Sequence, residues 1–313
     1  MTPAFFIQTA MLTFLSLTAF AANAIICRWA LDAGMIDPVS FTNLRLASGA
    51  MMLFFVVAWV SWKKRPKTPI TRPGEPSVSK GSWRAAVVLF LYAITFSYGY
   101  VAISTATGAL VLAAVVQLTM IGYALRAGDR LHGAEWIGVA LALIGLLYLV
   151  YPKLTTPSWW GLVMVVASAY TWALYTINGR KSKNPLQDTA YNFFRTLPLV
   201  AVAAIAFIPF MSLSWQGVAL AVFSGAITSG LGYILWYKAL PRISSSLASA
   251  SQLLVPLMAA FGAAWLINEP ITLRFVLSAA LMLGGLGLVL WGRHRHRRFF
   301  NAKPTIQTTE LKR

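Results

Sequence analysis

Ten runs of mostly apolar residues dominate this sequence, and each is close to the length that a bilayer-spanning helix needs, about 20 residues. Hydrophobic residues make up 58% of the chain and charged residues 11%, whereas a soluble domain carries roughly 25% charged residues. The sequence therefore predicts an all-α integral membrane protein with ten transmembrane helices. The runs cover residues 6–30, 38–61, 85–103, 107–126, 133–151, 158–178, 190–209, 216–238, 244–267 and 272–292.

The two halves of the chain resemble each other. In residues 99–125 and again in 237–267, a Tyr-x-Ala turn leads into an apolar segment rich in Ser, Thr and Ala. Each segment ends at a short polar loop with an acid, Asp129 in the first half and Glu269 in the second. Five helices per copy is an odd number, so the second copy is predicted to cross the membrane upside down.

Inverted repeats of this kind are common in secondary transporters, which bind substrate near the midplane where the halves meet. We expect a first five-helix repeat over 1–152, which contains a basic linker at 63–84. A second repeat is expected over 153–292, followed by a basic cytoplasmic tail over 293–313.

The net charge of +18 reflects membrane orientation and not nucleic-acid binding. The Lys and Arg residues concentrate in alternate inter-helix loops and in the C-terminal tail, and the opposite loops hold few beyond Lys153 and Arg274. Positive loops face the cytoplasm. The sequence thus predicts a multi-pass protein of the bacterial inner membrane with both termini cytoplasmic.

Several short motifs, spread from about residue 12 to 292, carry a family resemblance. They are Asp37-Pro38 followed by Arg45, Trp172-Ala173-Leu174-Tyr175, Ser251-Gln252 with Pro256, Gly128-Asp129-Arg130-Leu131 and Asn268-Glu269-Pro270-Ile271. Together with the repeat, they resemble the ten-helix EamA-type members of the drug/metabolite transporter superfamily. The resemblance implies a transporter of amino acids, nucleosides, drugs or other metabolites. The chain departs from the pattern in its long 63–84 linker and in Val116, which stands where the second copy has Pro256.

Polar and aromatic side chains deep in the spans are the candidate substrate contacts. Amides hydrogen-bond a zwitterion or a hydroxyl without carrying charge, although they also join helices to each other. Trp172 and Tyr175 are three residues apart and share a helix face, where they either line a cavity or pack. The candidate substrate-binding residues are Asn23, Tyr98, Gln117, Trp172, Tyr175, Asn192, Tyr233 and Gln252.

Two arginines enter the apolar runs at equivalent positions of the two copies, Arg45 and Arg195. Each either reaches a loop carbonyl or an acid such as Asp37 or Asp188, or recognises a carboxylate or phosphate. We assign both to gating or structural roles. Pro256 removes a helical hydrogen bond and provides a kink. Asp129 and Glu269 complete this gating and structural group.

These features predict an exporter of small metabolites that works by alternating access, with amino acids, aromatic ones among them, as the first expected cargo. The acids and histidines lie in loops, tails or helix ends, which favours facilitated transport or exchange over tight proton coupling. Efflux of lipophilic drugs and a non-transporting scaffold or receptor are the alternatives. No catalytic or metal-binding motif is present, so we expect no enzyme activity, no metal and no cofactor. The partners expected are a small-molecule substrate and the lipid bilayer, and the duplicated halves predict a monomer.

Overall fold

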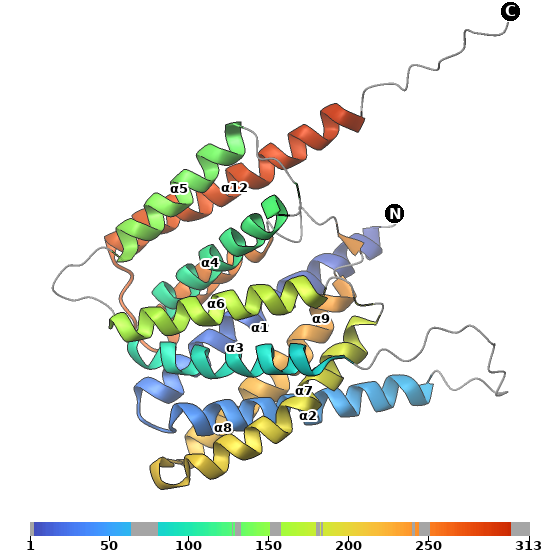
Figure 1. Ribbon diagram of the computed structural model, residues 1–313, viewed down its shortest axis with the longest axis vertical. Coiled ribbons are helices and arrows are strands. Elements are labelled where there is room, and N and C mark those ends of the chain that lie inside the picture. The colour runs from blue at the N-terminus through green and yellow to red at the C-terminus, as the bar shows by residue number, and fades with distance from the viewer. Residues whose placement is uncertain are drawn as a thin grey trace, which may run out of the picture.

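The computed structural model describes residues 3–63, 81–126, 128, 133–150, 158–179, 182, 184–239, 242–243 and 251–301. All regular elements over these residues are helices (Figure 1), which confirms the predicted fold class. Most of the 63–84 linker and the predicted start of the ninth span lie outside the described residues. The helices are α1 Pro3–Asp32, α2 Pro38–Lys63, α3 Trp83–Ala102, α4 Thr105–Arg126, α5 Gly133–Val150, α6 Trp159–Gly179, α7 Pro185–Ala206, η1 Ile208–Phe210, α8 Trp215–Phe223, η2 Ser224–Leu231, α9 Gly232–Ala239, α11 Leu254–Leu266 and α12 Leu273–Asn301.

Eight spans in the described part of the chain are long and apolar enough to cross a membrane, and α8, η2 and α9 form one of them. Two apolar helices, α5 and α11, are shorter. The last helix, α12, continues to Asn301, nine residues past the predicted end at 292. The predicted basic tail therefore begins inside a helix.

Side-chain caps fix where several helices begin. Ser82 and Ser214 accept hydrogen bonds from backbone N–H groups in the first turns of α3 and α8, and Asn184 does the same for α7. Such caps satisfy donors that a helix leaves unpaired at its start. Asp37 also accepts from the Ser40 N–H, at 2.9 Å, in the first turn of α2.

Loops that are far apart in sequence meet at the ends of the helices. The Asp37 carboxylate accepts from the backbone N–H of Ser212 at 3.1 Å, which joins the α1–α2 loop to the loop before α8. The Gly81 N–H donates to the Asp188 carboxylate at 2.8 Å, which joins the start of α3 to that of α7.

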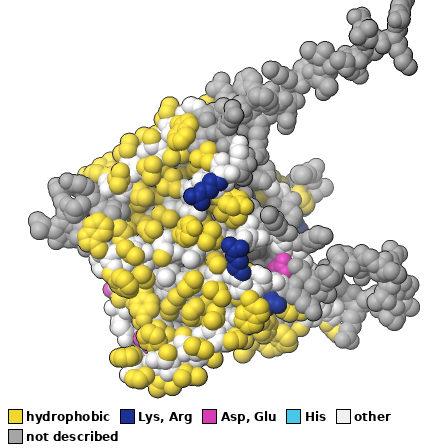
Figure 2. Space-filling model, viewed as in Figure 1, with side chains coloured by type: hydrophobic (Ala, Val, Ile, Leu, Met, Phe, Trp, Pro, Cys, Tyr) yellow, Lys and Arg dark blue, Asp and Glu magenta, His cyan; other side chains and the backbone are white. Residues whose placement is uncertain are grey.

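Large apolar side chains cover the outside of the helix bundle. Figure 2 shows hydrophobic side chains over most of the visible face, with few charged groups among them. Trp265 and Phe6 are 82% and 74% exposed. A surface of this kind is costly in water but matches lipid. The interior, in contrast, contains many small residues, including fully buried Ala30, Ala114 and Ala173.

The α5–α12 pair lies along one side of the bundle and packs against α4 (Figure 1). Gly138 and Gly285 bring the two backbones together, because a Cβ atom added at either residue would meet the carbonyl oxygen of the other. Small residues permit such close approach where lipid supplies no hydrophobic driving force between helices. The neighbouring Gly284 faces open space.

We predict that Gly285→Ala lowers stability, since its new Cβ would lie 2.5 Å from the Gly138 carbonyl oxygen and 2.7 Å from the Ala142 nitrogen. Overpacking of this kind costs about 1–3 kcal/mol. Gly284→Ala is the matched control, and its better helix propensity is worth up to about 1 kcal/mol. Melting temperatures of the purified variants in detergent micelles compare the two. Equal melting temperatures would contradict this account of α5–α12 packing.

Candidate functional site

One face of α3 is aromatic. Tyr92, Phe96 and Tyr100 recur every four residues, so they lie on the same side of the helix. They are 7%, 3% and 0% exposed. The Phe96 ring lies 5.6 Å from Tyr92 and 4.5 Å from Tyr100, between centroids. Tyr98 lies about 200° around the helix from Phe96, is half-buried, and makes no ring contact within the described structure.

Rings from α6 and α9 extend this face into a larger group. The Trp172 ring lies 4.8 Å from Tyr92, 5.5 Å from Tyr233 and 5.7 Å from Tyr175, on which it stacks. We call Tyr92, Phe96, Trp172, Tyr175 and Tyr233 the aromatic cluster. It brings together three of the predicted substrate residues from two different helices, and a fourth, Asn192, reaches it through a 3.4 Å hydrogen bond from its amide nitrogen to the Tyr175 hydroxyl.

Arg45 lies against the edge of the aromatic cluster and is 3% exposed. Its guanidinium carbon is 4.9 Å from the Phe96 centroid and 5.5 Å from that of Tyr92. Its Nε donates to the Ser229 hydroxyl and one Nη donates to the Tyr92 hydroxyl, both at 3.3 Å. The other nitrogen, Nη1, is buried and has no hydrogen-bond partner in the part of the chain that the structure describes.

No carboxylate of the described residues forms an ion pair with Arg45. The suggestion that Asp37 partners it is wrong, because Asp37 bonds to the backbone of Ser40 and Ser212. A charged side chain buried in a membrane-spanning helix is costly. The rings around Arg45 return part of that energy through cation–π attraction.

The eighth span has a π-helical centre, η2, that faces α1 and α2. Its Ser224 and Thr228 hydroxyls donate to the Asn23 amide oxygen at 2.7 and 3.2 Å. Gly225 permits close approach to α2, because a Cβ there would collide with the Arg45 carbonyl oxygen. π-Helical turns occur frequently at functional sites, and here η2 supplies polar groups to a buried helix junction.

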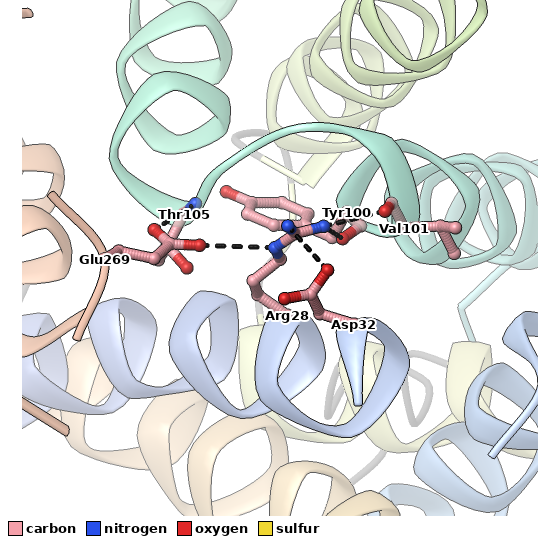
Figure 3. A network of polar contacts seen from close by, with 6 residues as sticks. All are labelled: Arg28, Asp32, Tyr100, Val101, Thr105 and Glu269. Carbon is pink, nitrogen blue, oxygen red and sulfur yellow. Dashed lines mark hydrogen bonds and ion pairs between the residues drawn. The ribbon is translucent and has the colours of Figure 1, made fainter. Parts of the chain in front are cut away.

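A second polar group ties α1 to two loops (Figure 3). Arg28 pairs with Glu269 at 3.2 Å and with Asp32 at 2.7 Å. Glu269 in turn accepts from the Thr105 N–H at 2.8 Å. The remaining Arg28 contacts, at 3.0 and 2.7 Å, are with the carbonyl oxygens of Tyr100 and Val101. We call these six residues the Arg28–Glu269 network.

The network joins the end of α1, the α3–α4 connection and the α11–α12 loop, so it holds three separate parts of the chain in place. Arg28 and Glu269 are 15% and 14% exposed, whereas Asp32 is 57% exposed. The Arg28–Glu269 pair is therefore partly shielded from solvent screening, and the Arg28–Asp32 pair is close to an ordinary surface pair.

Gln117, Gln252, Arg195 and Pro256 are the other predicted residues that the structure describes. Gln117 and Gln252 are half-buried, and their amides form no hydrogen bond in the described part of the chain. Arg195 stacks over Trp83 at 5.8 Å, near the start of α3. Pro256 lies in the first turn of α11, just after a turn at Leu253 that interrupts the helix. Asp129 lies outside the described residues.

Sequence reasoning missed Arg28, Tyr92, Phe96 and Ser229 as site residues. The four-residue spacing of Tyr92, Phe96 and Tyr100 was a usable signal, because it places three rings on one helix face. Arg28 was visible as a charge near the end of an apolar run. Nothing in the sequence singled out Ser229, because its contact with Arg45 depends on the η2 backbone. Over the described residues, no three His, Cys, Asp or Glu side chains group as metal ligands.

Comparisons with known proteins agree with this architecture. A model of the EamA-like transporter family matches residues 159–291. An uncharacterized protein of Pseudomonas aeruginosa is 41% identical over 90% of this chain and 94% of its own length. A probable amino-acid metabolite efflux pump of Escherichia coli is 24% identical, over 82% of this chain and 87% of its own.

A solved crystal structure with 18% sequence identity superposes with a TM-score of 0.59, over 91% of this chain and 98% of that chain. At this identity the likeness extends to the fold alone. With the family model, the full-length relatives and the apolar helix bundle, the chain belongs to the EamA-like transporter family, which is a family of multi-pass membrane transporters and not of enzymes.

Proposed function

We propose that this protein exports small metabolites, amino acids first among them, across the bacterial inner membrane by alternating access. The observation that carries the proposal is the buried junction of aromatic and polar groups around Arg45. A lipid-embedded bundle gains nothing from burying a guanidinium unless that group serves a function. Relatives in Escherichia coli and Salmonella typhimurium are named probable amino-acid metabolite efflux pumps, which supports amino acids as the cargo.

Helix pairing supports two related halves of five helices each. The second helices of the halves, α2 and α7, pack together, and so do the fifth helices, α5 and α12. The first helix packs on the eighth span through α9, and the sixth, α6, packs on the third, α3. If the two halves are equivalent, the first helix corresponds to the sixth and the third to the eighth. The contact between the first and eighth helices then has its counterpart in the contact between the sixth and third. In such transporters, one half rocks against the other around a central site.

Facilitated transport or exchange is the mechanism that the carboxylate positions favour. Every carboxylate in the described part of the chain lies at a helix end or in a loop, and these are Asp32, Asp37, Glu135, Asp188 and Glu269. Proton-coupled transporters commonly place their relay carboxylates inside the membrane. We therefore assign the driving force to the gradient of the cargo itself.

The Arg28–Glu269 network is the gate on the side of the membrane away from the cytoplasm. The charge asymmetry of the loops supports cytoplasmic termini, and with that orientation the end of α1 and the α11–α12 loop face the opposite side. Breaking the Arg28–Glu269 pair frees this loop from α1 and from the start of α4. Opening at this end would give the central junction access to the exterior.

We expect the purified protein in liposomes to catalyse saturable flux of labelled amino acids that is unchanged by a pH gradient. The physical reason is the location of the described carboxylates at helix ends. A panel of amino acids, nucleosides and lipophilic cations, each run with and without the gradient, checks cargo and coupling together. Strong gradient dependence would contradict the facilitator mechanism, and flux of lipophilic cations alone would favour drug efflux.

Trp172→Ala should weaken the apparent affinity of that flux about 2–10-fold, since an aromatic pair contributes roughly 0.5–1.5 kcal/mol and 1.4 kcal/mol is a tenfold change. Trp265→Ala is the control, because Trp265 is 82% exposed on the outer surface. Initial rates over a range of amino-acid concentrations give the comparison. An identical response of the two variants would count against a central binding site at the aromatic cluster.

Glu269→Gln should open the gate more often. Cys27, the single cysteine of the chain, reports on this directly because it is 0% exposed and precedes Arg28. A hydrogen bond to a charged group contributes about 1.5–3 kcal/mol, so its loss should raise the population of the open gate by about tenfold or more. The rate of N-ethylmaleimide labelling of Cys27 should rise by the same factor. Asp32→Asn is the control and should label at nearly the wild-type rate. Unchanged labelling of Glu269→Gln would rule out this gate.

A further inference from the structure

Arg45 has the features of an anion-binding group whose anion is not supplied by any residue that the structure describes. It is a permanent cation, 3% exposed, and its buried Nη1 has no acceptor among the described residues. Its hydrogen bonds go to two neutral hydroxyls, those of Ser229 and Tyr92. Buried charges in proteins are normally paired.

The contrast with Arg28 within the same bundle strengthens this reading. Arg28 satisfies its charge with two carboxylates and two backbone carbonyls. The chain thus supplies acids to one membrane arginine and supplies none, among the described residues, to Arg45. A guanidinium presents donors in a planar fork that matches a carboxylate, and the free Nη1 is the part of that fork still available at Arg45.

The surroundings define the rest of the ligand. The aromatic cluster begins at the Arg45 guanidinium, which stacks over Tyr92 and Phe96, and continues through Trp172 to Tyr233. A molecule with a carboxylate at one end and an aromatic or apolar body at the other fits this order of groups. One cation balances one negative charge, so a monocarboxylate matches the site better than a doubly charged phosphate.

We propose that Arg45 docks the carboxylate of the cargo, while the aromatic cluster holds the cargo's aromatic or apolar body. This assignment deepens and rests on the proposed transport function. It changes the role of Arg45 from gating to substrate recognition. The ligand class is a molecule with one carboxylate and an aromatic or apolar body, and an amino acid with such a side chain is one member of that class.

Pairs of ligands that differ only in the carboxylate test the proposal on the unmodified protein. The purified full chain in nanodiscs would be titrated with phenylalanine and phenylalaninamide, and separately with 3-phenylpropionate and 3-phenylpropanamide. Binding would be followed by calorimetry and by protection of Cys27 from N-ethylmaleimide. In at least one pair, the carboxylate should bind about tenfold or more tightly than its amide, because a charge-assisted hydrogen bond is lost in the amide.

Variants then assign the effect to Arg45. Arg45→Gln should bind acid and amide equally, and Arg45→Lys, which keeps the charge without the fork, should retain part of the preference. Arg195→Gln is the matched control from the equivalent position of the other half, and it should keep the full preference. The melting temperature of each variant establishes that it is folded.

The outcomes separate this proposal from the proposed function. If 3-phenylpropionate binds through Arg45 and no amino acid does, the carboxylate site stands and the amino-acid cargo is wrong. If amino acids are transported but acid and amide bind alike, transport stands and the site is overturned. Binding of neither member of either pair to folded protein also overturns the site, as does an acid preference that survives in Arg45→Gln.

Discussion

The hydrocarbon core of a membrane provides no hydrogen-bond partner, and this constraint governs the whole structure. Backbone groups must be satisfied within the protein, so the described spans are helical and their starts are capped by residues such as Ser82 and Asn184. Polar side chains must likewise find partners inside the bundle. The amide oxygen of Asn23 accepts hydrogen bonds from two hydroxyls of η2. The guanidinium of Arg28 donates to the carboxylates and carbonyl oxygens of its network.

Against this background, an unsatisfied donor in the bundle interior carries information. Among the described residues, Arg45 Nη1 is such a donor, and it belongs to a side chain that cannot lose its charge. Cation–π attraction to the rings beside it lowers the free-energy cost of burying the guanidinium but does not neutralise its charge. Burial of the unpaired Arg45 charge raises the free energy of the protein without ligand. The same burial makes binding of a negatively charged ligand beside Arg45 favourable.

The two arginines that the predicted repeat pairs, Arg45 and Arg195, lie in different environments. Arg45 is enclosed by Tyr92 and Phe96 and contacts η2, whereas Arg195 is half-buried and stacks over Trp83. Trp83 and Phe96 are 13 residues apart on α3, which corresponds to about 20 Å at 1.5 Å per residue. Arg195 thus contacts the start of α3, and Arg45 contacts its middle.

The amino-acid sequence alone determined the fold class, most helix positions and the family resemblance. Bilayer thickness sets the length of a spanning helix, and both length and apolarity are visible in a local stretch of sequence. It also identified Trp172, Tyr175, Tyr233 and Arg45 as residues of interest. The tertiary structure decided which of them meet. The contact of Ser229 with Arg45 and the pairing of Arg28 with Glu269 across 241 positions both depend on how the helices pack. Packing is set by residues that are distant in the chain, such as Gly225 against α2 and Gly138 against Gly285, and a local sequence pattern does not specify these contacts.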